Sequence, residues 1–278
     1  MAMTSPSGRS MRRVSNSVLV IIGVCFALPL LWLLLASFDP TASLSVKWPS
    51  TLTLSNFTSI LTPALSFIPL WNSLLLSGGS AIITVVVAVL AAYPLSRYKL
   101  RVNKPYLYGI LFGTGLPITA MMVPVYSLFV SFNLIDSLPG TTLFMAATSL
   151  PIAIWMMKNF MDSVPVTLEE AAWIDGASMM TTLTRVVIPL MRPGIAVVFI
   201  FVFVQAWGNF FVPFVLLLSP EKQPAAVSIF AFFGQYGAVA YGKLAAYSII
   251  YSVPVLALYV FTSRVLGGGS ALAGAVKG

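Results

Sequence analysis

Carboxylates, the side chains best suited to acid–base chemistry, are concentrated in one stretch of this chain. Residues 161–192 carry four of its seven acidic residues, Asp162, Glu169, Glu170 and Asp175. The chain has no His, which excludes an imidazole base, a Ser-His-Asp triad and a His-ligated metal. Its single cysteine, Cys25, excludes a disulfide within the chain. We therefore expect that the chain is not an enzyme and holds no metal.

Local signals in this stretch predict a short helix. Thr167 and Glu170 have the Thr-x-x-Glu spacing of a capping box, in which each side chain bonds a backbone N–H at the start of the helix. The helix should therefore start near Leu168. Glu169 and Glu170 would then lie close to the positive end of the helix dipole.

A tight turn and a second short helix should follow. Gly176 can end the first helix by adopting a positive φ at little cost. The second helix is expected from about Ser178 to Val187, ending at Pro189, because proline has no backbone N–H to donate.

The composition of the whole chain indicates a membrane protein. Hydrophobic residues make up 59% of it and charged residues only 8%, compared with roughly 25% charged residues in soluble domains. About 20 apolar residues in a helix cross a hydrocarbon layer of roughly 30 Å. We expect an all-α membrane protein with six transmembrane helices, at about residues 14–38, 72–95, 106–130, 139–160, 194–218 and 244–266. The first apolar run has 25 residues, more than the roughly 7 to 15 of a signal peptide, so it should be retained as a helix.

The distribution of cations predicts the orientation. Six spans leave both termini on one side, and calling that side cytoplasmic places twelve Lys and Arg residues inside and only Lys47, Lys222 and Lys243 outside, as the positive-inside rule requires. The expected organisation is a cytoplasmic tail at 1–13, a transmembrane domain at 14–266 with the acidic stretch 161–192 in the cytoplasm, and a cytoplasmic tail at 267–278. The net charge of +8 then faces anionic membrane lipids, and no nucleic acid partner is expected.

Two further apolar segments need an interpretation. Residues 223–242 are uncharged and could form a seventh span, but we expect an external loop there. Residues 48–71 are interrupted by Pro49, Asn56, Pro63 and Pro69, so they should not contain a continuous helix of spanning length.

The acidic stretch also contains a spaced motif. Glu170-Ala171-Ala172 is followed after three residues by Gly176, and after nine more by Val186-Val187-Ile188-Pro189. This pattern resembles the EAA loop of bacterial ABC importer permeases, whose usual form is Glu-Ala-Ala, then Gly, then two aliphatic residues around any residue, then Pro. Asp175 and Ala177 beside the glycine extend the match.

Other segments are similar to the carbohydrate-uptake permeases of the maltose-transporter type. They are Asn72-Ser73-Leu74, the run Ala92 to Arg97, the run Gln205 to Phe210 and the terminal run Ala273 to Gly278. One of them departs from the usual pattern, since this chain has Trp207-Gly208-Asn209-Phe210 where members of that group often have Trp-Asn-Glu-Phe.

The resemblance implies a type I ABC importer permease fold, multi-pass in the bacterial plasma (inner) membrane, and transport of a sugar or sugar derivative. It implies three partners: a second permease subunit, a cytoplasmic ATPase dimer that binds ATP and Mg, and an extracytoplasmic solute-binding protein. The residues that would couple this chain to the ATPase are Glu169, Glu170, Ala171, Ala172, Asp175, Gly176 and Ala177. No cofactor is expected in this chain, because its nearest P-loop candidate, Gly237 to Lys243, lacks the Ser or Thr after the lysine.

Candidate residues for the solute path come from the spans. Gln205 and Asn209 are four residues apart, so they share a helix face, and polar groups in hydrocarbon must face a cavity or a partner. Contact with solute and hydrogen bonding between helices are equally open roles for them. Trp207 could stack on a sugar but points elsewhere on the helix, and Trp155 in the fourth span is a further candidate that could instead serve packing.

Three classes of function can be compared. The importer permease explains the spans, the acidic stretch and the missing P-loop. A secondary transporter or channel subunit is the alternative, but ionisable residues for ion coupling are lacking inside the spans. An intramembrane enzyme is the least favoured class, because no span offers paired carboxylates.

Overall fold

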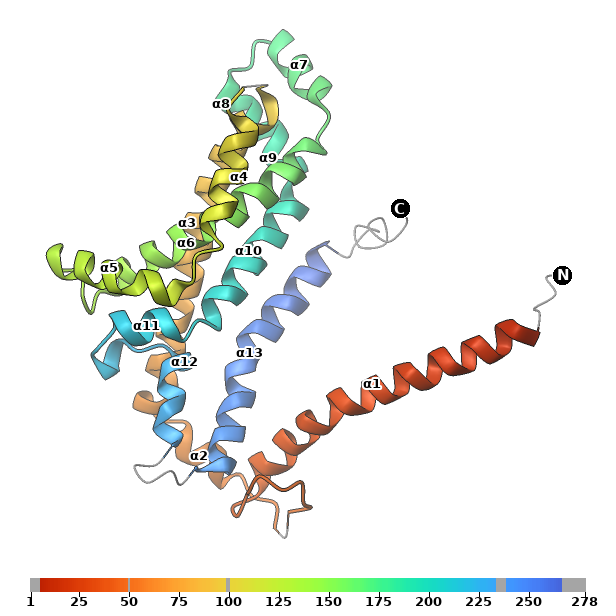
Figure 1. The fold of residues 1–278 in the computed structure, drawn as a ribbon, viewed down its shortest axis with the longest axis vertical. Coiled ribbons are helices and arrows are strands. Elements are labelled where there is room, and N and C mark those ends of the chain that lie inside the picture. Colours follow the sequence, from red (N-terminus) through yellow and green to blue (C-terminus); the bar gives the residue numbers. More distant parts are fainter. Residues whose placement is uncertain (1–5, 50, 99–100, 234–238, 267–278) are drawn as a thin grey trace. The chain divides into compact units, whose positions relative to one another are not determined.

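The chain folds almost entirely as helices (Figure 1). The computed structural model describes residues 6–49, 51–98, 101–233 and 239–266. The α-helices are α1 (Pro6–Phe38), α2 (Ser55–Ile60), α3 (Ile68–Arg97), α4 (Asn103–Gly113), α5 (Ile118–Ser131), α6 (Leu138–Asp162), α7 (Val166–Ile174), α8 (Met179–Thr182), α9 (Ile188–Leu190), α10 (Arg192–Trp207), α11 (Phe211–Leu216), α12 (Ala225–Ser228) and α13 (Tyr241–Leu266). The predicted C-terminal tail at 267–278 lies outside the described residues.

Two compact units make up the chain. One consists of residues 1–66 and 229–252, and the other of residues 67–228 and 253–278. The second unit holds both the acidic stretch and the candidate path residues, so the residues with a predicted role in transport share one compact unit.

The length and apolar character of the helices can be compared with the six predicted spans. Among the described residues four helical segments are long and apolar enough to cross a membrane: Val14–Phe38, Pro63–Arg97, Leu138–Asp162 and Tyr241–Arg264. Two bent helix pairs raise the number to six if each pair counts as one span. The first, second, fourth and sixth predicted spans are therefore confirmed as continuous helices.

The third predicted span, 106–130, is not one straight helix. It consists of α4 and α5, which meet at 90°. The break falls at residues 114–117, where Pro117 has an extended backbone with ψ of 127°. Since proline also disfavours helical backbone in the residue before it, α4 cannot run on into α5.

The fifth predicted span, 194–218, is wrong as a continuous helix. Helix α10 ends at Trp207, and α11 begins only at Phe211. Between them the side-chain oxygen of Asn209 accepts a hydrogen bond from the backbone N–H of Val212 at 3.1 Å. Such a bond supplies a partner for a free N–H in the first turn of a helix, so Asn209 favours a new helix start over continuation of α10.

Two prolines that were expected to stop helices are accommodated by π-helical turns. The π turns are η1 (Pro63–Phe67) and η2 (Leu183–Val187), and Pro69 and Pro189 each follow two residues after one of them. A π turn is wider than an α turn and moves the preceding carbonyls away from the proline ring. The second helix of the acidic stretch consequently continues past Pro189 to Leu190, and the helix of the second span starts ahead of residue 72.

The core of the second unit forms where α3 packs on α6 and α10. The hydroxyls of Ser80 and Thr84 in α3 donate to the backbone oxygens of Thr142 and Ala146 in α6, at 3.1 and 3.2 Å. A Cβ atom on Gly79 would lie only 2.8 Å from Thr142 Cγ2. Small residues and hydroxyl-to-backbone bonds are the usual means by which helices approach closely in a membrane.

The first unit contains α1, α2 and the start of α13. The Asn56 side chain in α2 is buried and donates to the backbone oxygens of Ser37 and Asp39 at 3.1 and 3.0 Å, which fixes the end of α1. Residues 223–242 contain α12, a 3₁₀ turn (Ile229–Phe232) and the bridge between Phe233 and Val239. Ahead of α13, which starts at Tyr241, the described part of this segment therefore has no helix of spanning length, while residues 234–238 lie outside the description.

Candidate functional site

The end of α7 confirms the conformation predicted for Gly176. Its φ is +82°, and two backbone bonds close the helix: Gly176 N–H donates to Trp173 at 3.0 Å, and Ala177 N–H donates to Ala172 at 2.9 Å. This pair of bonds defines a Schellman motif. Helix α8 follows after Ser178, whose hydroxyl accepts from the N–H of Thr181 at 3.3 Å. The predicted pair of short helices joined by a tight turn is therefore present.

The predicted start of α7 is wrong. The helix begins at Val166, directly after Pro165, and no side chain caps it. Thr167 thus lies within the first turn, and Glu170 is exposed, so the two do not form a capping box. Pro165 has a fixed φ of −59° and an extended ψ, which starts the helix two residues ahead of the expected position.

Glu169 lies in the first turn of α7, near the positive end of the helix dipole as expected, and it is also fully buried as half of an ion pair. Its carboxylate lies 2.6 Å from Arg97 Nε and accepts a hydrogen bond from Tyr93 Oη at 2.9 Å. Arg97 also donates to the backbone oxygen of Val164 at 3.2 Å. Its side chain is only 5% exposed. Both partners of Glu169 stand one turn apart at the end of α3, so the pair fixes α7 to that helix.

The other predicted coupling residues lie on the outer side of this loop. Glu170, Ala171, Asp175 and Gly176 are exposed, and Ala172 and Ala177 are half-buried. Large apolar side chains stand beside them, the most exposed being Ile174 at 86%. Trp173, Met179 and Met180 are exposed as well. These four apolar residues were missed in the sequence, although large apolar side chains in an otherwise polar loop are a detectable signal of a contact surface.

A cavity of about 380 Å³ lies where the break between α4 and α5 meets α6 and α10. Gln205 and Asn209 both line it, so the structure brings this predicted pair together. The other lining residues are Thr114, Met145, Thr148, Ser149, Ile152, Phe201 and Ala206. A second cavity of about 540 Å³ shares Thr114, Thr148 and Asn209 with the first.

The two candidate tryptophans do not line either cavity. Trp207 is 3% exposed, and its ring stacks on Phe203 with centroids 5.7 Å apart. Trp155 on α6 is 43% exposed. Packing inside the second unit thus accounts for Trp207.

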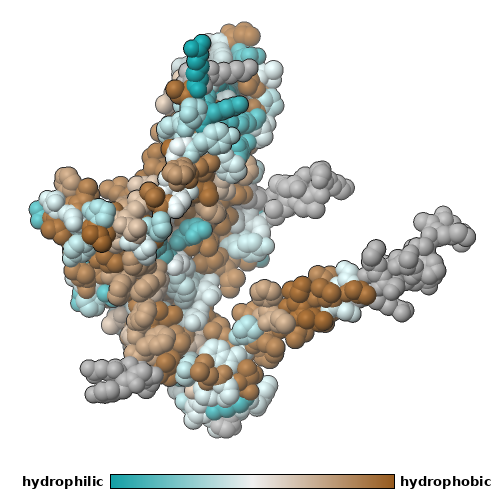
Figure 2. Space-filling model, in the orientation of Figure 1, coloured by the Kyte–Doolittle hydropathy of each residue, from teal (hydrophilic) through white to brown (hydrophobic). Residues whose placement is uncertain are grey.

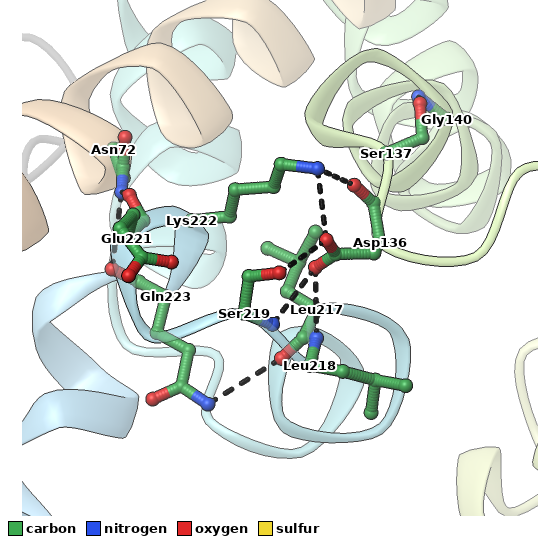
Figure 3. A network of polar contacts seen from close by, with 10 residues as sticks. All are labelled: Asn72, Asp136, Ser137, Gly140, Leu217, Leu218, Ser219, Glu221, Lys222 and Gln223. Atoms are coloured by element: carbon green, nitrogen blue, oxygen red, sulfur yellow. Dashed lines mark hydrogen bonds and ion pairs between the residues drawn. The ribbon is translucent and has the colours of Figure 1, made fainter.

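A polar network tied to Asp136 lies between α5 and α6 (Figure 3). Its carboxylate accepts from the backbone N–H groups of Leu218 and Ser219, both at 3.0 Å, from the Ser219 hydroxyl at 2.6 Å, and from Lys222 Nζ at 2.8 Å. These bonds, led by those from Lys222 and Ser219, lower the pKa of Asp136 well below its ordinary value. Asp136 is therefore an anion, and in that form it holds in place the segment that follows α11.

Asn72 at the start of α3 holds the same segment from another side. Its side-chain nitrogen donates to the backbone oxygens of Glu221 and Gln223 at 2.8 and 3.2 Å (Figure 3). The neighbouring Ser73 hydroxyl accepts from the N–H of Ala225 at 2.8 Å. The Asn-Ser pair noted in the sequence thus fixes the chain between α11 and α12.

Figure 2 shows hydrophilic residues gathered over the end of the second unit that carries α7 and α8, and hydrophobic residues along the helices that lead away from it. Apolar helices of spanning length, a polar loop anchored by a buried ion pair and a polar cavity between the helices together define a membrane transport subunit.

Comparison with known proteins places the chain within that class. Residues 84–266 match the family described as the binding-protein-dependent transport system inner membrane component, and the chain belongs to this family. It is therefore a multi-pass inner-membrane permease subunit of an ABC importer and not an enzyme. The alternative of a secondary transporter or channel is set aside by this membership.

Individual relatives agree with the family. The chain is 31% identical over 277 residues to the permease protein SmoH of the sulfoquinovosyl glycerol transport system of Agrobacterium fabrum, covering 98% of this chain and 95% of the relative. It is 30% identical over 256 residues to the trehalose transport system permease protein SugB of Mycobacterium tuberculosis, covering 90% and 92%. Among solved structures, a bacterial ABC transporter that imports the acidic polysaccharide alginate has a chain of the same fold, with a TM-score of 0.82 at 21% identity and coverage of 95% and 99%.

Proposed function

We propose that this chain forms one half of the translocation pathway of a sugar importer and that α7 receives the movement of an ATPase. The observation that carries the proposal is the form of the loop: an exposed apolar surface around Ile174 on a helix that is fixed from behind by the buried pair of Glu169 and Arg97. Exposed apolar surface with a polar rim is typical of a protein contact. The seven predicted coupling residues would form or support this contact.

The fixed helix offers a route for coupling. A displacement of α7 would act on α3 through Glu169 and Arg97, since that pair is buried and short. Helix α3 is bonded in turn to α6 through Ser80 and Thr84. Helix α6 lines the cavity with Thr148 and Ser149. We propose that ATP and Mg bind to a cytoplasmic ATPase dimer. The contacts from α7 through α3 to α6 would then transmit the closure of that dimer to the solute path.

The remaining partners and the orientation belong to the same proposal. If both tails and residues 161–192 share one side of the membrane, twelve of the fifteen cations would lie on that side. This count supports a cytoplasmic position for residues 161–192 and for the tails at 1–13 and 267–278. The transmembrane domain would span residues 14–266. A second permease would supply the other half of the pathway, and an extracytoplasmic solute-binding protein would deliver the solute.

A sugar is the proposed solute class. The relatives named above belong to transport systems for sulfoquinovosyl glycerol and trehalose, and a further one to a system for diacetylchitobiose. The polar cavity with Gln205 and Asn209 supports this class, because amide side chains can donate to and accept from sugar hydroxyls. We assign Gln205 and Asn209 to the solute path, and we keep Trp207 and Trp155 as candidates only for a different conformation of the pathway.

Reconstitution of the chain alone tests the proposal. Liposomes that contain only this chain are expected to take up no radiolabelled trehalose or diacetylchitobiose, because half a pathway without an ATPase cannot complete a transport cycle. Adding the second permease, the ATPase and the binding protein should give ATP-dependent uptake of at least one sugar. Uptake of a sugar by the lone chain would contradict the proposal.

A substitution at Gly176 tests whether the loop couples to the ATPase. Gly176→Val is expected to weaken retention of the ATPase and to lower solute-stimulated ATP hydrolysis, because a β-branched residue at φ of +82° costs roughly 1–2 kcal/mol. Apart from the glycine itself and its two chain neighbours, no residue has an atom within 4 Å of a Cβ placed there, so the effect should come from the backbone and the docking face. Gly176→Asn is the matched control, since Asn tolerates this conformation. Normal retention and normal stimulated hydrolysis in Gly176→Val would show that the glycine is not needed for coupling.

A further inference from the structure

The hydroxyl groups in the cavity between α4, α6 and α10 have their hydrogens committed to the backbone. Thr114 Oγ1 donates to the Leu111 oxygen at 2.6 Å. Thr148 and Ser149 both donate to the Met145 oxygen, at 3.0 and 2.9 Å. Since each hydroxyl has one hydrogen and two lone pairs, these three groups remain as acceptors toward the cavity that they line.

The amide of Asn209 differs from these hydroxyl groups, because it offers a donor and not an acceptor. Its oxygen accepts from the backbone N–H of Val212, which fixes the assignment of oxygen and nitrogen and leaves the NH₂ group to donate. Asn209 lines both cavities together with Thr114 and Thr148. The shared wall thus presents two acceptors and one donor group close together.

No charged side chain is among the residues that line either cavity in the described part of the chain. A sugar hydroxyl can donate to the threonine oxygens and accept from the Asn209 amide. A carboxylate or sulfonate can only accept, so among these groups it could bond only the amide N–H groups of Asn209 and Gln205. It would also face three acceptor oxygens, with no cation to balance its charge. Burying an unpaired anion is costly.

We infer that this cavity binds a neutral, hydroxyl-rich solute and disfavours anionic sugars, with Thr148 as a specificity-determining residue at the wall that both cavities share. The inference rests on the proposed function and narrows its solute class. A direct comparison of neutral and acidic sugars is needed, because a relative belongs to a transport system for sulfoquinovosyl glycerol, a sulfonated sugar. A chain of the same fold also belongs to an importer of the acidic polysaccharide alginate.

Direct binding to the purified complex of this chain, its second permease and its ATPase tests the inference. Leaving out the solute-binding protein removes that protein's own selectivity. The probes are radiolabelled maltose, trehalose and cellobiose, each paired with the uronic acid formed by oxidising one of its CH₂OH groups. At least one neutral sugar is expected to bind ten or more times more tightly than its acidic partner.

Variants at Thr148 link that preference to this wall. Thr148→Val should weaken binding of the neutral sugar roughly 3- to 10-fold, the usual effect of losing one hydrogen bond. Thr148→Lys should reduce the ratio of neutral-sugar affinity to acidic-sugar affinity at least 10-fold. The matched control is Thr142→Val, because Thr142 is also on α6 and donates to the Leu138 oxygen but does not line either cavity.

Three results would overturn the inference: equal binding of the acidic and neutral sugars, equal effects of Thr148→Val and Thr142→Val, or no binding of any probe by a complex that retains its ATPase. In each of these the proposed permease function stands. A complex that fails to retain the ATPase contradicts the proposed function itself.

Discussion

Glu169→Gln is expected to release α7 from the end of α3. The Glu169 carboxylate is fully buried, and the substitution leaves Arg97 with a side chain 5% exposed and no opposite charge. Removing one partner of a buried ion pair destabilises by about 3–5 kcal/mol. Hydrogen exchange of the α7 amides should therefore be faster by about 100-fold or more, since each 1.4 kcal/mol corresponds to about tenfold.

The adjacent glutamate is the matched control for this substitution. Glu170 is exposed, so Glu170→Gln should change stability by less than about 0.5 kcal/mol. The double substitution Arg97→Met with Glu169→Leu should recover much of the stability, because apolar residues of similar volume often replace a buried pair at little cost. Equal exchange rates in Glu169→Gln and Glu170→Gln would show that the ion pair does not hold α7.

The coupling loop illustrates which features of this protein can be predicted from sequence. The conformation of Gly176 was predictable because it depends on a turn of a few residues. The roles of Glu169 and Glu170 were not, because the partner that draws Glu169 inward, Arg97, is 72 residues away in the chain. The ion pair accounts for the burial of Glu169, whereas the expected capping box is absent because the helix starts directly after Pro165, ahead of Thr167.

The membrane spans also combine features that could be predicted from sequence with features that could not. The apolar content predicted which segments are helical, and four spans are continuous helices as expected. It could not predict the 90° bend between α4 and α5 or the end of α10 at Trp207. Hydropathy is nearly the same for a straight helix and for two helices, whereas the breaks depend on Pro117 and on the side chain of Asn209. These two breaks border the cavity, so the solute path was the least predictable part.

Asp136→Asn is expected to loosen the segment after α11 and to remove an acid-sensitive part of the stability. Asp136 adopts a φ of 60°, which Asn tolerates, so the backbone should be kept. The neutral amide loses the charge-assisted bonds from Lys222 and Ser219. Hydrogen bonds to a charged group contribute about 1.5–3 kcal/mol, and this destabilisation is expected near pH 7 in thermal unfolding of the complex.

The pH dependence of unfolding shows whether Asp136 stabilises the fold through its charge or through the shape of its side chain. The folded protein lowers the pKa of Asp136 from its ordinary value of 3.8, so the anion stabilises the fold above about pH 4. That contribution is lost as the pH falls from there through the lower folded-state pKa. The gap in unfolding temperature between the parent and Asp136→Asn should therefore close on acidification.

The exposed neighbour Glu221 supplies the control for this last substitution. Glu221→Gln removes a charge from the same segment, but it leaves the backbone oxygen that accepts from Asn72 in place. It should change the unfolding temperature little at any pH. Lys222→Met should reproduce part of the Asp136→Asn effect, because it removes the cation 2.8 Å from the carboxylate. A gap that stays constant from pH 7 to pH 3 would mean that Asp136 acts through shape and not through its charge.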